Sequence, residues 1–307
     1  MENSFSYSFS FARFFAGKWQ FAPRAAALGF LLAILATAAR AQERPYFITY
    51  DSQMEEPGNL EIALNPVVGL PKKGNTFVGS WMEFEYGATA WWTTEFYLDG
   101  QTTTNDSTVF TGYRWENRFR PLRGEHWINP VLYVEFENIN EADRTILEVV
   151  GFDSGRDNTT PNAEARRVKK RELESKLILG SNYRGWNISE NFIAEKNLTG
   201  GTWEFGYAVG VARPLALAAS AKECTFCREN FRAGLEMYGG LGDWHHFTLS
   251  KTSHYLAPVL AWELPSGVTL HVSPGFGLTA NSYRSLIRFG VSYEFSGFGR
   301  KVRRLFR

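Results

Sequence analysis

The sequence predicts an all-β protein built as an antiparallel transmembrane β-barrel of about 12 strands, with about 10 to 14 allowed. Segments close to the ~9–11 residues that cross a bilayer when tilted alternate between large apolar and small or polar side chains. Aromatic residues form 16% of the chain, and many lie near segment ends. Short turns also alternate with long connections, as is typical of membrane barrels.

The first 41 residues have the three parts of a signal peptide. Basic residues precede an uncharged apolar run at 25–38. Ala39 and Ala41 then supply the two small side chains that a signal peptidase recognises before its cleavage site. The run is shorter than the roughly 20 residues of a spanning helix, so cleavage near Ala41 is favoured over an N-terminal anchor. We expect a signal peptide at 1–41, a barrel domain at 42–295 and a basic tail at 296–307.

Charge and hydropathy narrow the classes of protein. Four of the 33 basic residues and one of the 32 acidic residues lie in the first 41, which leaves 29 basic and 31 acidic residues in the mature chain. A slightly negative chain is not expected to bind nucleic acid, because such binding depends on neutralising phosphates. After residue 41 no apolar run is long enough for a membrane helix, so strands must carry any membrane crossing.

Period-two alternation marks candidate strands along most of the chain. In 202–213, Trp203, Phe205 and Tyr207 share one face while small or polar residues occupy the other. The candidates are 59–68, 77–87, 90–99, 107–119, 126–137, 145–151, 172–183, 186–196, 202–213, 230–239, 254–264, 267–278 and 285–295. Thirteen is odd, whereas a barrel with both ends on one side needs an even number. Either 145–151 is not a crossing or Tyr46–Asp51 adds a strand, and we expect twelve.

A soluble β-sandwich would also give strands with one apolar face. The bilayer-matched lengths, the aromatic residues near strand ends and the alternating loop lengths favour the barrel. Short turns at 184–185 and 265–267 contrast with long connections at 152–171 and 241–253.

The last strand carries a family resemblance. Its apolar face holds alternate residues and ends in an aromatic side chain: Ile287, Phe289, Val291, Tyr293 and Phe295. This resembles the C-terminal membrane-targeting strand of bacterial outer-membrane β-barrel proteins. The resemblance covers eleven residues and implies a Gram-negative outer membrane, insertion by the barrel-assembly machinery, and contact with outer-membrane lipids and lipopolysaccharide.

The chain departs from that pattern after Phe295, where twelve further residues follow. They are strongly basic, and they either form a solvated charge run or contact anionic lipid headgroups. A second basic run, at 166–171 in a predicted external loop, could contact lipopolysaccharide phosphates or simply face water.

Charged residues on the second face of the strands are expected to point into the barrel. Both signs occur, so these side chains either line a hydrated pore or pair across a closed interior. The excess of Glu over Arg and Lys favours cations if a path exists. The candidates are Glu83, Glu85, Arg114, Glu116, Arg118, Glu135, Glu137, Arg232, Glu236, Glu263 and Arg288.

Cys224 and Cys227 are the only cysteines. In an exported protein a pair favours a disulfide, here a local staple. Arg228 follows, so the haem-attachment motif is not formed, and no second Cys or His pair stands at zinc spacing. Reduced thiols, a redox pair and a metal site remain alternatives to the staple.

A histidine cluster raises the question of catalysis. Some outer-membrane barrels are lipid hydrolases that use Ser and His, and His245, His246, Ser253 and His254 lie around one predicted external loop. Ser253 and His254 are adjacent, so in a strand they point to opposite faces. We assign no catalytic residue, no metal ligand and no cofactor. The function expected is a porin-like channel for small solutes, with a filled structural barrel or a lipid hydrolase as alternatives; the oligomeric state is open.

Overall fold

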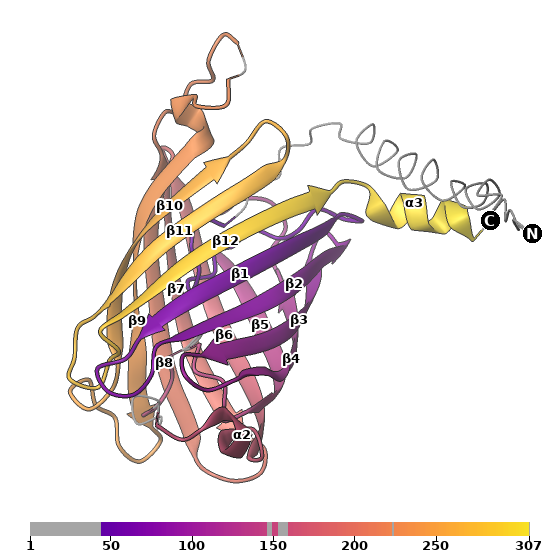
Figure 1. The fold of residues 1–307 in the computed structure, drawn as a ribbon. Helices are drawn as coiled ribbons and strands as arrows, with labels where there is room; N and C mark the ends of the chain where they lie inside the picture. Colours follow the sequence, from indigo (N-terminus) through magenta and orange to yellow (C-terminus); the bar gives the residue numbers. More distant parts are fainter. Residues whose placement is uncertain (1–43, 146–148, 153–158, 223, 307) are drawn as a thin grey trace, which may run out of the picture. The chain divides into compact units, whose positions relative to one another are not determined.

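A closed barrel of twelve antiparallel strands forms the protein, and the predicted fold class is confirmed (Figure 1). The computed structural model describes residues 44–145, 149–152, 159–222 and 224–306, so the predicted signal peptide lies outside the described residues. Each strand pairs with its sequence neighbours, and β1 pairs with β12. The strands are β1 Leu60–Leu70, β2 Phe77–Thr89, β3 Trp92–Thr103, β4 Thr108–Phe119, β5 Asn129–Asn140, β6 Lys169–Tyr183, β7 Trp186–Asn197, β8 Trp203–Pro214, β9 Phe231–Asp243, β10 His254–Glu263, β11 Val268–Gly277 and β12 Ser285–Phe295.

The barrel is polar inside and apolar outside. In β4, Tyr113 and Trp115 are 36% and 53% exposed on the outer face, whereas Arg114, Glu116 and Arg118 are at most 3% exposed inside. Strand alternation places these two sets on opposite faces. The same contrast recurs around the wall, where Phe96, Leu132, Phe192, Val209, Leu260 and Phe289 are all exposed. A water-soluble sandwich would bury that apolar face, so the inverted pattern matches a membrane barrel.

Aromatic side chains lie at both ends of the apolar belt. Trp91, Trp127 and Trp186 are exposed at the end where β1 begins, which we call the termini end. Trp244 and Phe247 are exposed at the opposite end, the loop end, where α2 (Asn162–Ala165) lies. Such residues prefer the boundary between lipid and water.

A two-residue turn closes the hairpin between β6 and β7 at the termini end. Arg184 and Gly185 both have positive φ, of 50° and 82°. This conformation follows the twist of the flanking strands and favours glycine. The turn after β10 and the segment with both cysteines lie at the same end.

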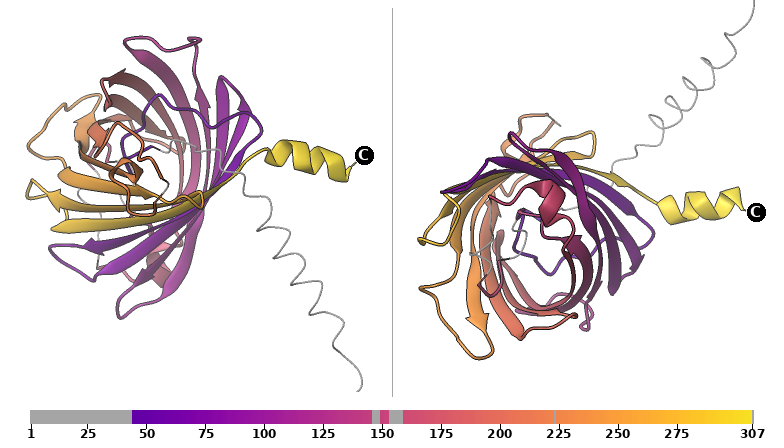
Figure 2. Two further views of the ribbon diagram at one scale, coloured as in Figure 1. Left: turned by 90° about the horizontal axis from the view of Figure 1, so that it is seen from above. Right: turned by 60° about the horizontal axis from the view of Figure 1, so that its bottom comes forward.

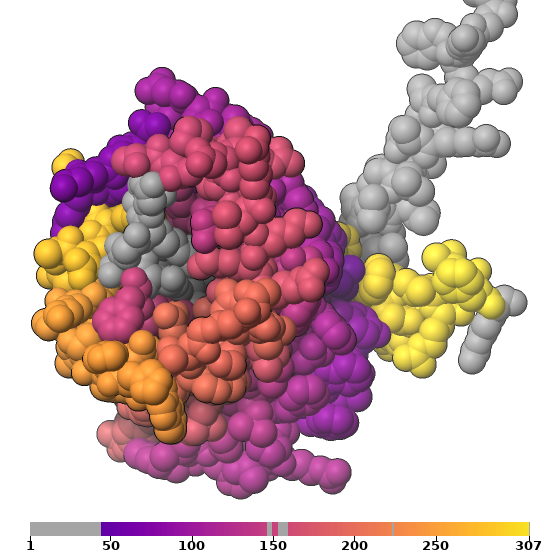
Figure 3. Space-filling view, turned by 90° about the horizontal axis from the view of Figure 1, so that it is seen from below, coloured from indigo at the N-terminus to yellow at the C-terminus, as the bar shows by residue number. Residues whose placement is uncertain are grey.

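The connection between β5 and β6 folds into the barrel at the loop end. Val150 forms an isolated bridge with Gly206 of β8, and Gly151 forms one with Gly242 of β9. The described part of the predicted segment 145–151, Thr145 and residues 149–151, therefore forms no separate crossing, and the described strands number twelve. Figure 2 (right) shows α2 of the same connection beside the mouth, and Figure 3 shows the crowded loop end in space-filling form.

The C-terminal tail forms helix α3, Phe298–Leu305, which projects beside the barrel from the termini end (Figure 1). The backbone N–H of Gly299 donates to the carbonyl of Gly58 at 2.8 Å. Among the described residues, no helix is long and apolar enough to cross a membrane.

Candidate functional site

Residues 44–56 run through the interior of the barrel and form its inner segment, drawn in indigo in Figure 2. Tyr46, Ile48 and Tyr50 are at most 5% exposed. The alternative that Tyr46–Asp51 adds a strand is wrong, because this stretch pairs with no other strand. Its backbone groups instead find partners on strand side chains, as buried polar groups must.

Two side chains hold the backbone of the inner segment. Glu236 of β9 accepts from the N–H groups of Ile48 and Thr49, both at 3.0 Å. Asn191 of β7 accepts from the N–H of Tyr50 at 2.7 Å and donates to its carbonyl at 2.8 Å. The Asn191 amide thus substitutes for a neighbouring strand, and Glu236 provides stronger, charge-assisted bonds.

Tyr50 anchors the segment on the opposite wall. Its hydroxyl donates to Glu116 of β4 at 2.8 Å, and its ring packs edge-on against Tyr133 with centroids 5.1 Å apart. The ammonium group of Lys176 lies 4.4 Å from the ring centroid, a cation–π distance. Tyr50 therefore joins the inner segment to β4, β5 and β6.

Strand glycines make room for the inner segment. A Cβ on Gly210 of β8 would lie 2.7 Å from the ring of Tyr46, and one on Gly180 of β6 would lie 2.6 Å from the hydroxyl of Ser52. Larger residues at either position would overlap the segment. The fit between wall and segment is therefore built into the strands.

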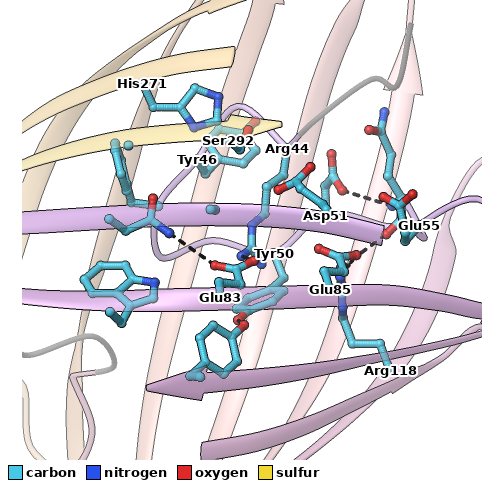
Figure 4. A pocket seen from close by; sticks show the side chains of 18 of the residues that line it. Arg44, Tyr46, Tyr50, Asp51, Glu55, Glu83, Glu85, Arg118, His271 and Ser292 are labelled. Carbon is cyan, nitrogen blue, oxygen red and sulfur yellow. Dashed lines mark hydrogen bonds and ion pairs between the residues drawn. The ribbon is translucent and has the colours of Figure 1, made fainter. Parts of the chain in front are cut away.

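The charged side chains of the wall form a shared network. Arg114 binds Asp99 at 3.2 Å and Glu135 at 3.0 Å. Arg118 pairs with Glu85 and Glu95. Arg44 of the inner segment pairs with Glu83 of β2 at 3.0 Å (Figure 4).

Acidic groups outnumber basic ones in this interior. Among the described residues, fifteen Asp or Glu side chains are buried, against five Arg or Lys. In two places, three buried carboxylates approach within 4.8 Å of one another: Glu61, Glu83 and Glu85, and Glu137, Glu174 and Glu195. The interior of the barrel is thus rich in carboxyl groups.

Most of the predicted lumen-facing residues are buried inside the barrel. The buried ones are Glu83, Glu85, Arg114, Glu116, Arg118, Glu135, Glu137, Glu236 and Arg288. Arg232 and Glu263 are only partly buried and pair with each other at 2.8 Å, at the termini ends of β9 and β10. Sequence reasoning missed Glu95, Asp99 and Glu174, which strand alternation could have identified. It also missed Asn191, which alternation within the 186–196 segment places on the inward face, and the path of residues 44–56 through the interior, for which no sequence pattern gave a signal.

A cavity of about 80 Å³ remains between the inner segment and strands β1–β4, β11 and β12 (Figure 4). Arg44, Tyr50, Glu83, Glu85 and Arg118 are among the residues that line it. This volume is enough for several water molecules, which need about 10–15 Å³ each by the same measure. The interior is therefore narrow and polar.

The infolded β5–β6 connection narrows the barrel from the loop end. The Arg144 N–H donates to Gln101 of β3 at 2.9 Å, and the Arg144 guanidinium donates to the Thr160 carbonyl at 2.6 Å. Arg288 of β12 donates to the hydroxyl of Tyr238 at 2.7 Å and to the Thr145 carbonyl at 3.4 Å. The connection is therefore fixed to strands on both sides of the barrel.

Glu55 ends the inner segment at the termini end. Burial, reinforced by the nearby Glu294 carboxylate, raises the pKa of Glu55 to about 8. The Arg118 guanidinium opposes this rise, and the backbone N–H of Glu55 donates to the Thr93 hydroxyl at 3.1 Å. Glu55 can therefore change charge near neutral pH.

The serine and histidine cluster does not form a nucleophile–base pair. The Ser253 hydroxyl donates to the Asn281 carbonyl at 3.2 Å. The His254 ring contacts the Tyr207 hydroxyl at 3.0 Å and the Thr252 hydroxyl at 2.9 Å. His245 and His246 are exposed, and their backbone N–H groups donate to the carboxylate of Asp243.

Cys224 and Cys227 form a disulfide in the connection between β8 and β9, with Cα atoms 5.3 Å apart. Phe226, between them, stacks on Trp262 of β10 at a centroid distance of 4.9 Å. The Trp262 indole N–H donates to the Thr225 carbonyl at 2.9 Å. The disulfide therefore staples a turn that packs on the outer rim of the barrel.

No protein-family model and no curated protein matches the sequence. Among solved structures, the COG4313 outer membrane channel from Pseudomonas putida F1 is similar with a TM-score of 0.53 and 8% identity, over 83% of this chain and 100% of that one. The chain has the fold of an outer-membrane β-barrel. The NanC porin is a weaker match to this barrel, with a TM-score of 0.42 and 11% identity, over 76% of this chain and 98% of that one.

Proposed function

We propose that the protein is an outer-membrane channel that passes small cations and small neutral solutes through a narrow, electronegative interior. The observation that carries the proposal is the excess of buried carboxylates around a water-sized cavity. Carboxylates lining a narrow, low-dielectric path attract cations and repel anions. The COG4313 structure, itself described as a channel, has the same fold.

Membrane placement belongs to the same proposal. The exposed apolar belt and the aromatic residues at both of its ends match the surface that lipid requires. Export would follow signal-peptide cleavage near Ala41, and the termini end would face the periplasm. Heat-modifiable electrophoretic mobility of the membrane fraction tests this placement; a soluble protein without a mobility shift would overturn it.

Selectivity tests the channel. Refolded protein in a planar bilayer, under a tenfold KCl gradient, should give discrete conductance steps with a reversal potential on the cation side. Glu83→Gln removes a carboxylate from the cavity lining and should shift that potential toward zero. Glu190→Gln is the matched control, because Glu190 is exposed on the outer face of β7. Anion selectivity, or equal shifts in both variants, would contradict the proposal.

A barrel with a closed interior is the second candidate. It is favoured by the inner segment and the infolded β5–β6 connection, which enter the interior from opposite ends. Such a barrel would act through its surface, and it would show no stable steps in the same bilayer experiment. That single outcome separates the two functions.

A further inference from the structure

A second site lies on the outer wall of the barrel, beside α3. An open groove of about 850 Å³ separates the helix from the strands. The strands contribute Leu60, Phe96, Trp115 and Phe136, and the helix contributes Phe298, Val302 and Arg303. Thr94 and Glu95 also border the groove, and Glu95 is buried on the inward face of β3. Apart from Arg303, the other side chains named here are apolar or aromatic, so the groove would hold a hydrocarbon chain.

The groove has a direction. Leu60 is the first residue of β1 at the termini end, whereas Phe136 lies near the middle of β5. Between them, Phe96 and Trp115 are 40% and 53% exposed on the outer wall. The groove therefore extends from the rim of the barrel toward the centre of the apolar belt, the direction of an acyl chain entering a bilayer leaflet.

The helix supplies positive charge at the rim. Its sequence includes Arg300, Lys301, Arg303 and Arg304 and no acidic residue. Arg303 lines the groove, whereas Arg304 does not. A guanidinium next to an apolar groove at the headgroup level suits a phosphate whose acyl chain lies in that groove.

We propose that this groove binds one anionic phospholipid of the adjacent leaflet, with its phosphate on Arg303 and an acyl chain along Phe96 and Trp115. The proposal rests on the membrane placement proposed above. Continuity with the lipid-facing belt and the charge of α3 both favour this occupant over a second copy of the chain.

Native mass spectrometry of the refolded mature chain in detergent, titrated with phosphatidylglycerol or phosphatidylcholine, tests the site. We expect one tightly retained phosphatidylglycerol and weaker retention of phosphatidylcholine. Arg303→Gln should weaken phosphatidylglycerol binding about tenfold, the loss of one charge-assisted contact. Arg304→Gln removes the same charge one residue further along and should bind like the wild type. Val302→Asp should reduce binding of both lipids.

Equal weakening in the Arg303 and Arg304 variants would overturn the site, since it would show a delocalised charge effect. The wild type could instead be a dimer without retained lipid that the Val302→Asp substitution converts to a monomer. That result would overturn the lipid site and show that the groove binds a second copy of the chain. Heat-modifiable mobility is measured on the same preparations. A heat-modifiable barrel without lipid preference overturns the site alone, whereas a protein with no mobility shift overturns the membrane placement.

Discussion

The carboxylate of Glu236 on β9 accepts a hydrogen bond from the backbone N–H of Ile48 at 3.0 Å. The donor belongs to the inner segment, which precedes the first strand, and the acceptor lies in the wall. The contact shows how this barrel fills its interior: a segment without strand pairing is held by strand side chains. Whatever crosses the barrel must pass beside that segment or displace it.

Weakening this contact should release the inner segment. Glu236→Gln leaves one carbonyl oxygen and places an amide donor against backbone N–H groups. Losing about 2 kcal/mol of charge-assisted bonding would raise the undocked fraction about 30-fold. We expect larger conductance steps and faster chymotryptic cleavage after Tyr50, which is buried while the segment is docked. Glu190→Gln on the outer face should change neither, and unchanged cleavage in Glu236→Gln would show that other contacts suffice.

Crowding the wall should have a related effect. Gly210→Ala places a methyl group where the ring of Tyr46 lies. Overpacking of this kind costs about 1–3 kcal/mol. Denaturant unfolding in lipid vesicles should show that loss. Gly100→Ala is the control, because the nearest atom to its new Cβ is the Val109 carbonyl oxygen at an ordinary 3.5 Å. Equal stability of the two variants would mean that the Tyr46 ring moves freely.

Docking of the inner segment should depend on pH through Glu55. Its pKa of about 8 in the folded protein exceeds the ordinary 4.5, so the folded state holds the proton more tightly. The stabilisation is complete below about pH 4.5 and is lost as pH rises toward 8. Chymotryptic cleavage after Tyr50 should accelerate as pH rises through the upper part of that window, where this protease is active. Glu55→Gln should remove this pH dependence of the cleavage rate. An identical pH profile in wild type and variant would exclude Glu55 as the group responsible.

Reducing the disulfide should leave the barrel intact. The bond closes a very short loop, so the chain-entropy estimate of its contribution is only about 2 kcal/mol. We expect Cys224→Ser/Cys227→Ser to keep wild-type conductance and heat-modifiable mobility. Trp262 fluorescence should change, because Phe226 stacks on that ring. Trp127, exposed on another turn at the same end, should be unaffected, as single-tryptophan variants can test. Loss of conductance in the double variant would show that the disulfide is needed for the barrel itself to form or stay open.

The sequence by itself determined the barrel. Strand alternation sorts Trp115 outward and Glu116 inward wherever the register falls, because successive side chains point to opposite faces. An even number of strands followed from the expectation that both ends of the barrel domain lie on the same side of the membrane. The same alternation would have identified Glu95 and Asp99, which continue the inward face of the 90–99 segment.

Tertiary structure decided what fills the interior. Tyr46–Asp51 has the local pattern of a strand, and its path through the barrel depends on Glu236, Asn191 and Glu116, which lie far along the chain. Residues 149–151 likewise bridge β8 and β9 rather than crossing. The outer groove needs α3 and β1–β5 together. Local periodicity reports which face a residue occupies, whereas the partners across a barrel are set only when the wall closes.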